Sequence, residues 1–119
     1  MIHKNPITVY GGNQSRDFVY VGDVVNCLYK AMERLDQSNL SETVNILTGK
    51  SVTINNLVEI LSTNLSIKPD IKYEPLPAGD PEKSDGTSEK MIELLEVNIE
   101  NFTVIDEGLK KTISYIKKA

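Results

Sequence analysis

The chain has 119 residues, of which 39% are hydrophobic and 25% are charged, so it is long and apolar enough to bury a core. Its net charge of −4 at pH 7 and its sequence pI of about 5.0 argue against a nucleic-acid-binding protein, which needs a basic face. No apolar run reaches the roughly 18 residues of a membrane-spanning helix, and no secretory signal is visible. We therefore expect a single cytoplasmic domain over residues 1–119, with neither a membrane nor a nucleic acid as partner.

Side chains that carry chemistry are scarce. The one cysteine, Cys27, excludes an internal disulfide and a multi-cysteine metal site, and the one histidine, His3, lies near the start of the chain. Cys27 borders the apolar side of a predicted helix without a basic neighbour in sequence, which favours a small buried hydrophobic residue over a reactive thiol. No glycine-rich pattern opens a helix, and no GxSxG motif occurs. We predict no catalytic residue, no metal ligand and no cofactor site in this chain.

The first third of the chain predicts two strands and a helix. Apolar, β-branched residues alternate with polar ones over residues 6–10, which predicts a strand that ends at a glycine pair. After a polar loop, residues 18–21 predict a second strand. From residue 23 to about residue 35 apolar residues recur at helical spacing, and we expect Asp23 to cap the first turn. The expected buried stripe of this helix is Val24, Leu28, Ala31, Met32 and Leu35.

The middle of the chain predicts a strand, a helix and a further strand. Residues 44–47 predict a strand that ends at a Thr-Gly pair, and Thr53 is expected to cap the helix that follows. Residues 71–73 alternate again and predict a short strand. The next stretch, residues 74–86, holds three of the five prolines, so we predict an irregular loop there.

The last third predicts two helices. The first of them is expected to begin at Thr87 or Ser88. Thr103 and Asp106 have the spacing of a capping box at the start of the second. Its later turns carry lysines, which we interpret as a solvated face that matches the negative end of the helix dipole rather than as a ligand site. These lysines are Lys110, Lys111, Lys117 and Lys118.

Two places are candidates for contact with a ligand. Arg16 stands among uncharged loop residues before an apolar run, and a guanidinium there can donate two hydrogen bonds to a phosphate. The alternative is a salt bridge from Arg16 to Asp17 or Asp23, and the residues alone leave both interpretations open. The second candidate is Asp80 in a Gly-Asp-Pro turn, for which the alternative is a plain turn.

These motifs together resemble a known family. GGNQSRDFVYVGDVV resembles the GDGxQxRDFxYVxDVV stretch of nucleotide-sugar epimerases and dehydratases, in the extended short-chain dehydrogenase/reductase superfamily. VNILTGKSVTINNLVEIL, YEPLPAGDPEKSDGTSEKMIELL and IDEGLKKTISYIKK follow in the order that this family shows. The resemblance covers about residues 6–118 and is strongest to the branch that resembles UDP-glucose 4-epimerase.

The resemblance implies a mixed α/β domain of about four helices and three to five short strands. It would be the C-terminal, substrate-binding lobe of a Rossmann-type epimerase, without the half that binds NAD. The glycine-rich NAD site and the Tyr-x-x-x-Lys pair of the family have no match here, so NAD is implied for the full-length enzyme and no cofactor for this chain. The start of the chain then resembles a truncation inside a helix that leads into Pro6.

The resemblance also implies site residues. Arg16 matches the arginine that contacts the diphosphate, Val9 and Tyr10 match the strand that lies along uracil and ribose, and Asp80 matches the acid near the nucleotide. A second arginine that the family often carries is replaced by Pro77, which should weaken binding by roughly 1.5–3 kcal/mol. The implied partner is a nucleotide sugar, most simply a UDP-sugar.

The sequence thus predicts the sugar-nucleotide-binding part of an NAD-dependent epimerase, inactive by itself. Two alternatives stay open. One is the same part of a related dehydratase, decarboxylase or reductase, and the other is a non-catalytic remnant or interaction module. Because a face that normally packs on a missing domain is apolar, we also expect self-association through that face or partial disorder near the N-terminus.

Overall fold

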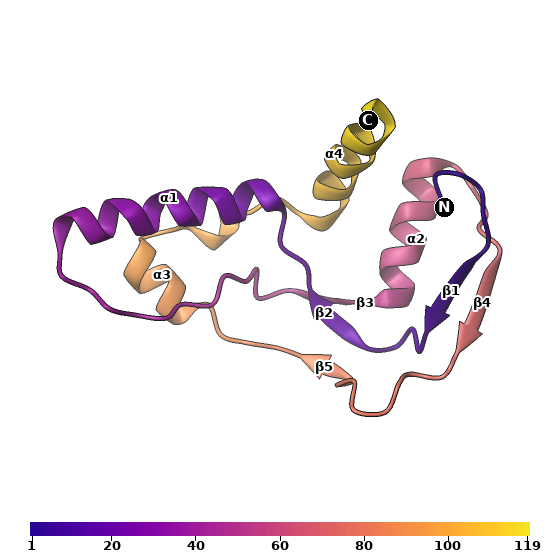
Figure 1. The fold of residues 1–119 in the computed structure, drawn as a ribbon, viewed down its shortest axis with the longest axis horizontal. Coiled ribbons are helices and arrows are strands. Elements are labelled where there is room, and N and C mark those ends of the chain that lie inside the picture. The colour runs from indigo at the N-terminus through magenta and orange to yellow at the C-terminus, as the bar shows by residue number, and fades with distance from the viewer. The chain divides into compact units, whose positions relative to one another are not determined.

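The computed structural model describes residues 1–119, which form four α-helices, five short strands and one 3₁₀ turn (Figure 1). In chain order they are β1 (Ile7–Tyr10), β2 (Ser15–Asp17), α1 (Val21–Gln37), β3 (Ser51–Thr53), α2 (Ile54–Leu65), β4 (Ile71–Glu74), β5 (Lys83–Ser84), α3 (Glu89–Leu95), η1 (Ile99–Asn101) and α4 (Ile105–Lys118). This content confirms the predicted mixed α/β class. None of the helices combines the length and the apolar character that crossing a membrane requires.

The chain divides into two compact units. The strand unit comprises Met1–Arg16 and Ser51–Ser84, and the helix unit comprises Asp17–Lys50 and Asp85–Ala119. Each unit is therefore built from two segments that are distant in sequence, and each is described here by itself.

The strand unit contains a parallel pair of strands, in which Ile7–Tyr10 of β1 runs in register with Ile71–Glu74 of β4 (Figure 1). A second sheet has the strand order β3-β2-β5, and β2 and β5 are parallel. α2 follows β3 directly because Thr53 caps it: its hydroxyl oxygen accepts a hydrogen bond of 3.1 Å from the backbone N–H of Asn56. The predicted strands at residues 6–10 and 71–73 and the predicted Thr53 cap are confirmed.

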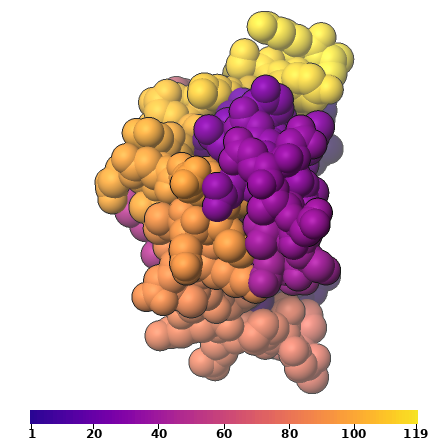
Figure 2. Space-filling model, turned by 90° about the vertical axis from the view of Figure 1, so that its left-hand side faces the viewer, coloured from indigo at the N-terminus to yellow at the C-terminus, as the bar shows by residue number.

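The helix unit has a well-defined core. Cys27 of α1 and Met91 of α3 are each 1% exposed and lie in one cluster with Leu95 and Val97. Five partly buried residues pack around it, namely Ala31, Val44, Ile46, Ile99 and Phe102. Figure 2 shows the purple α1 segment beside the orange segment that contains α3. The prediction that Cys27 is a buried hydrophobic residue is confirmed, and α3 begins after Ser88 as predicted.

Two aspartates tie loops of the helix unit together. The Asp17 carboxylate accepts hydrogen bonds from the backbone N–H groups of Thr48 at 3.0 Å and Gly49 at 2.7 Å, and from the Thr48 hydroxyl at 2.6 Å. The Asp23 carboxylate accepts from the N–H of Thr103 at 2.8 Å and from its hydroxyl at 3.2 Å. Hydrogen bonds to an ionised acceptor are stronger than neutral ones, so these contacts fix both loops.

The second of these contacts explains one incorrect local prediction, the cap at Asp23, and the strand that precedes it is also predicted incorrectly. The second strand is Ser15–Asp17 rather than residues 18–21, and α1 begins at Val21, so Asp23 lies inside the first turn and does not cap the helix. The Asp23 carboxylate is bonded to Thr103 and is not free for the open amides of α1.

The predicted capping box at Thr103 is wrong for the same reason. α4 begins at Ile105, and the residue before it, Val104, makes no side-chain cap bond. Thr103 donates its hydroxyl to Asp23, where a capping box would direct that oxygen to the first turn of α4.

The predicted strand at residues 44–47 is also wrong, because the strand of this region is β3, at Ser51–Thr53. Val44 and Ile46 pack against the core of the helix unit, and Leu47 is 7% exposed. The apolar residues of this segment are therefore buried against the core, although the segment does not pair with another strand.

The predicted stripe of α1 lies only partly against the core, since Ala31 packs there but three of the five residues do not. Leu28, Met32 and Leu35 are 58–64% exposed, whereas Cys27 is buried. The periodicity is that of an amphipathic helix, but the packed side of the helix is displaced from the stripe by about one residue, which is 100° of rotation.

Candidate functional site

Arg16 lies on β2 with its guanidinium partly exposed. One terminal nitrogen, Nη1, donates a hydrogen bond of 2.7 Å to the carbonyl oxygen of Ser15, and Nη2 lies 3.9 Å from Oδ1 of Asp80. The Arg16 and Asp80 side chains are 26% and 50% exposed, so both reach solvent. The structure thus brings together two predicted site residues from distant parts of the chain. A separation of 3.9 Å is a loose ion pair, which another anion can replace.

The alternative explanation for Arg16 was a salt bridge to Asp17 or Asp23. Both of those carboxylates are engaged with backbone amides of the helix unit, from Thr48 and Thr103 respectively. The ion pair of Arg16 is with Asp80 instead.

Asp80 ends a tight turn. Its backbone N–H donates a hydrogen bond of 3.1 Å to the carbonyl oxygen of Pro77, and Gly79 between them has φ = +89°, a conformation that favours glycine. The two interpretations of Asp80, a turn residue and a ligand contact, are therefore compatible. The turn places its carboxylate near Arg16.

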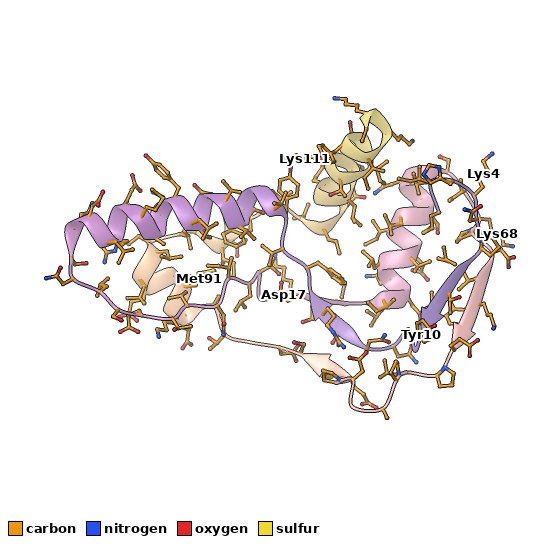
Figure 3. All side chains as sticks on the ribbon, in the orientation of Figure 1. Lys4, Tyr10, Asp17, Lys68, Met91 and Lys111 are labelled. Atoms are coloured by element: carbon orange, nitrogen blue, oxygen red, sulfur yellow. The ribbon has the colours of Figure 1, made fainter.

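Val9 and Tyr10 are neighbours on β1 and differ in accessibility. The Val9 side chain is 5% exposed and belongs to the core, whereas Tyr10 is 54% exposed at the end of the strand (Figure 3). Successive side chains on a strand point to opposite faces. Of this predicted pair, only Tyr10 presents its side chain to solvent, whereas Val9 is buried.

Gln14 was not predicted, and it holds the turn between β1 and β2. Its side-chain oxygen accepts from the N–H of Gly12 at 2.5 Å, and its side-chain N–H group donates to the carbonyl oxygen of Tyr10 at 2.6 Å. Gln14 is 9% exposed, and Gly11 and Gly12 have φ of +72° and +122°. The sequence shows this loop only as polar. The one weak indication that the Gln14 amide is buried is its position two residues after the glycine pair.

The glycine pair does not offer a site for a dinucleotide. The N–H of Gly11 donates to the carbonyl oxygen of Glu74 at 2.8 Å, and the N–H of Gly12 donates to Gln14. Both backbone N–H groups are thus hydrogen-bonded within the unit. A pyrophosphate site requires a glycine-rich turn that leads into a helix, whereas this turn leads into β2. The described residues therefore do not fit NAD. No group of three or more His, Cys, Asp or Glu side chains is arranged to hold a metal ion.

A pocket of about 360 Å³ lies on another part of the strand unit. Gly11, Asn13, Gln14, Leu76, Glu82 and Lys83 line it, but Arg16 does not. The register explains the separation, because Ser15 pairs with Lys83 while Arg16 pairs with Ser84, and paired residues of neighbouring strands share a face. Lys83 therefore does not replace the second arginine of the family motif, whose position Pro77 occupies here.

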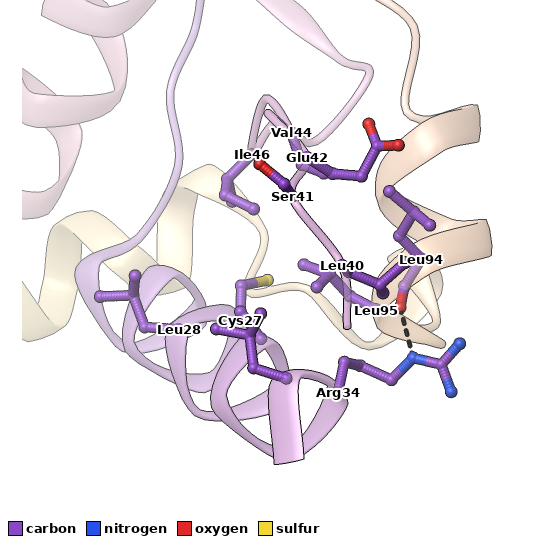
Figure 4. Close-up of a pocket in the computed structure, with 12 residues that line it drawn as sticks. Cys27, Leu28, Arg34, Leu40, Ser41, Glu42, Val44, Ile46, Leu94 and Leu95 are labelled. Atoms are coloured by element: carbon purple, nitrogen blue, oxygen red, sulfur yellow. Dashed lines mark hydrogen bonds between the residues drawn. The ribbon is translucent and has the colours of Figure 1, made fainter. Parts of the chain in front are cut away.

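The helix unit carries a larger, apolar cavity of about 380 Å³ (Figure 4). Leu28, Leu35, Leu40, Val44, Ile46 and Leu95 supply much of its lining, and Cys27 lies at its edge. Burial, and to a smaller extent the nearby Asp23 carboxylate, raises the pKa of the Cys27 thiol above its ordinary value of 9.0. Such a thiol is protonated and a poor nucleophile at neutral pH.

Comparisons with known proteins place these features in a family. Residues 1–46 match the model of the NAD dependent epimerase/dehydratase family. The chain is 33% identical over 113 residues to a UDP-glucuronic acid decarboxylase 1 of Danio rerio, covering 94% of this chain and 26% of that protein. It is 39% identical over 72 residues to a putative UDP-glucose 4-epimerase of Methanocaldococcus jannaschii, covering 60% of this chain and 22% of that protein.

The fold agrees with these sequence matches. A UDP-glucose 4-epimerase of Thermotoga maritima, solved with UDP-glucose, matches 99% of this chain with a TM-score of 0.86 and 33% identity, and 37% of that protein is covered. The chain spans about a quarter of the length of the curated relatives that it matches. On the matched family model, the relatives along nearly the whole chain and the shared fold, the chain is similar to part of the members of the NAD-dependent epimerase/dehydratase family.

Proposed function

We propose that this chain binds a UDP-sugar through Arg16 in the strand unit, as the substrate-binding part of a nucleotide-sugar epimerase. The observation that carries the proposal is the loose pair between Arg16 and Asp80, 3.9 Å apart with both side chains open to solvent. A diphosphate offers the guanidinium a bidentate partner with more charge than one carboxylate. The similarity to this family supports the ligand class, since the Thermotoga maritima relative was solved with UDP-glucose.

The other candidate residues have distinct tasks in this proposal. The exposed ring of Tyr10 gives the nucleotide base an apolar surface to stack on, and buried Val9 keeps β1 in place behind it. Asp80 exchanges its contact with Arg16 for a hydroxyl of the nucleotide sugar. In this proposal the task of this chain is to bind and orient the substrate.

The test is a titration of the chain with UDP-glucose, followed by NMR and calorimetry. We expect chemical-shift changes centred on Tyr10, Arg16 and Asp80. Arg16→Ala removes a charge-assisted contact and should weaken binding by about ten- to a hundredfold. Lys72→Ala is the matched control, because Lys72 is a 74% exposed cation of the same unit outside the site, and it should change affinity less than about twofold.

Two results would contradict the proposal. If millimolar UDP-glucose causes no shifts, the chain is better explained as a non-catalytic remnant or interaction module. If the purified chain with NAD converts UDP-glucose to its epimer, the chain does more than bind its substrate.

A second candidate is the corresponding part of a decarboxylase. The match to a UDP-glucuronic acid decarboxylase, at 33% identity over 94% of this chain, favours it. UDP-glucuronic acid carries an extra carboxylate, so a site selected for that sugar should bind it more tightly than UDP-glucose. Equal or weaker binding of UDP-glucuronic acid in the same titration would favour the epimerase.

A further inference from the structure

We propose that Gln14 is a positioning residue of the UDP-sugar site, whose side-chain amide locks the turn between β1 and β2 in the conformation that carries Tyr10 and Arg16. This role rests on the function proposed above and adds to that site a residue that does not itself contact the ligand. Gln14 lies four residues after Tyr10 and two residues before Arg16. It is 9% exposed, so its amide is removed from water and needs partners within the protein.

Both ends of the Gln14 amide bind the backbone of this turn. Oε1 accepts a hydrogen bond of 2.5 Å from the N–H of Gly12, and Nε2 donates one of 2.6 Å to the carbonyl oxygen of Tyr10. The turn thus presents one donor and one acceptor, and a primary amide supplies the matching acceptor and donor side by side. A flipped amide would set N–H against N–H and oxygen against oxygen. The Gln14 side chain therefore joins the end of β1 to the middle of the turn.

Backbone hydrogen bonds hold the outer side of the same turn. The carbonyl oxygen of Gly12 accepts from the N–H of Asn55 at 2.9 Å. The carbonyl oxygen of Gln14 accepts from the N–H of Ile54 at 3.1 Å. These contacts tie the turn to the start of α2, whereas the Gln14 side chain fixes its inner side.

Gly11 leaves the space that the Gln14 amide occupies. Its φ is +72°, and a Cβ atom at this position would lie 2.6 Å from Oε1 of Gln14. That distance is too short for a nonbonded contact, so a side chain at Gly11 would displace the amide. The glycine therefore allows the buried amide to reach both of its partners.

Gln14 acts on the ligand site through the backbone. It lines the pocket of about 360 Å³ in the strand unit, whereas Arg16 does not. A lock of this kind strengthens binding because it keeps the competent conformation populated before the ligand arrives, and the apparent affinity falls in proportion to that population. Loss of the lock should therefore weaken binding without removing a contact to the ligand.

Gln14→Glu tests the lock, because the introduced carboxyl group has nearly the shape of the amide. As a carboxylate it accepts from Gly12 but sets an oxygen against the carbonyl oxygen of Tyr10. As a carboxylic acid it regains a donor and can form both hydrogen bonds. Burial and the facing carbonyl oxygen disfavour the charged form, so we expect the pKa of the introduced group to lie above the ordinary value of about 4.3. The charged side chains that line the same pocket, Glu82 and Lys83, are present in every variant.

The measurement is a calorimetric titration with UDP-glucose at about pH 7.5, and at a lower pH at which NMR shows the introduced carboxyl group to be protonated. Gln14→Glu should bind about ten- to thirtyfold more weakly than the native chain at the higher pH, and within about threefold of it at the lower pH. Gln14→Met is the matched control, because it has a similar length but forms neither strong hydrogen bond and does not titrate. It should bind weakly at both pH values, and it keeps the test open if the carboxylate variant unfolds at the higher pH.

NMR without ligand reports the lock directly. In Gln14→Glu the signal of the Gly12 N–H should return toward its native position as the carboxyl group takes up its proton, while the native chain and Gln14→Met should show no such change. Circular dichroism checks that each variant is folded at both pH values.

The outcomes separate this role from the proposed function. If the native chain binds UDP-glucose and Gln14→Glu binds it equally well at the higher pH, Gln14 does not position the site, and the proposed function stands. Weak binding by protonated Gln14→Glu, with the Gly12 signal at its native position, would also overturn the role of the lock. If the native chain itself binds no UDP-glucose, the proposed function fails and the role of Gln14 fails with it.

Discussion

The two units of this chain are stabilised in different ways. In the strand unit the fully buried hydrophobic residue is Val9, and the buried polar residue is Gln14. The other buried hydrophobic residues belong to the helix unit, namely Cys27, Leu47, Met91, Leu95, Val97 and Ile113. The candidate ligand site thus lies in the unit that depends on directed hydrogen bonds, whereas the helix unit depends on packing.

This difference has a consequence for function. A hydrogen-bonded turn holds Tyr10 and β2 in a defined geometry without covering them, so Arg16 stays accessible to a ligand. A packed core covers the side chains that form it, such as Cys27 and Met91. The two units should therefore respond to different kinds of substitution.

The largest effect is expected from a cavity in the helix unit. Met91→Ala removes a side chain that is 1% exposed and should lower the free energy of unfolding of this unit by about 2–5 kcal/mol. Ile92→Ala, at the next position and 38% exposed, should cost less than about 1.5 kcal/mol. Urea unfolding followed by NMR signals of each unit measures both. An equal loss in the strand unit would show that the two units do not respond separately.

A smaller effect is expected from Gln14→Ala in the strand unit. The substitution leaves the N–H of Gly12 and the carbonyl oxygen of Tyr10 without their partner, which should cost about 1–3 kcal/mol. It should also weaken UDP-sugar binding, since the turn that leads to Arg16 loosens. Asn13→Ala, at an exposed neighbouring position, should affect binding less in the same calorimetric titration. If the two variants bind alike, the turn does not position Arg16.

A similar cost is expected where the helix unit itself uses hydrogen bonds. Asp17→Asn weakens three contacts to Thr48 and Gly49 and should lower the stability of the helix unit by about 1–3 kcal/mol. Glu59→Gln removes a charge from an exposed position of α2 and serves as the control for charge. A stability change below about 0.5 kcal/mol for Asp17→Asn would mean that packing alone holds the helix unit.

The sequence predicts the elements whose signals are local. Residues 6–10 and 71–73 alternate and form strands, and the cap at Thr53 depends only on the amide three residues later. The incorrect predictions at Asp23 and Thr103 have the opposite character. Each of these side chains is a good local cap, but they bond to each other across 80 positions, and a local pattern does not contain that contact.

The candidate site shows the same division. Arg16 and Asp80 stand out through their resemblance to a family motif, but their approach to 3.9 Å depends on the fold of the strand unit. Their role in binding stays a prediction. Periodicity likewise shows that α1 is amphipathic without showing which side meets the core, so Leu28 was expected inside and lies outside.

The smallest effect, and the one that separates the units by pH, involves Cys27. Burial raises the pKa of its thiol above 9.0, so folding favours the protonated form. The stabilising contribution is complete below the unfolded pKa of about 9 and is lost as the pH rises through the higher folded value. The free energy of unfolding of the helix unit should therefore fall above pH 9, by at most about 1.4 kcal/mol per pH unit.

Cys27→Ala isolates this contribution, because every other titratable group is present in both proteins. The native chain should lose more stability than the variant between about pH 9 and pH 11, and only in signals of the helix unit. Parallel curves for the two proteins would mean that the thiolate forms without unfolding. In that case the core around Met91 admits water, and the contrast between a packed helix unit and a hydrogen-bonded strand unit is weaker than the burial of Cys27 indicates.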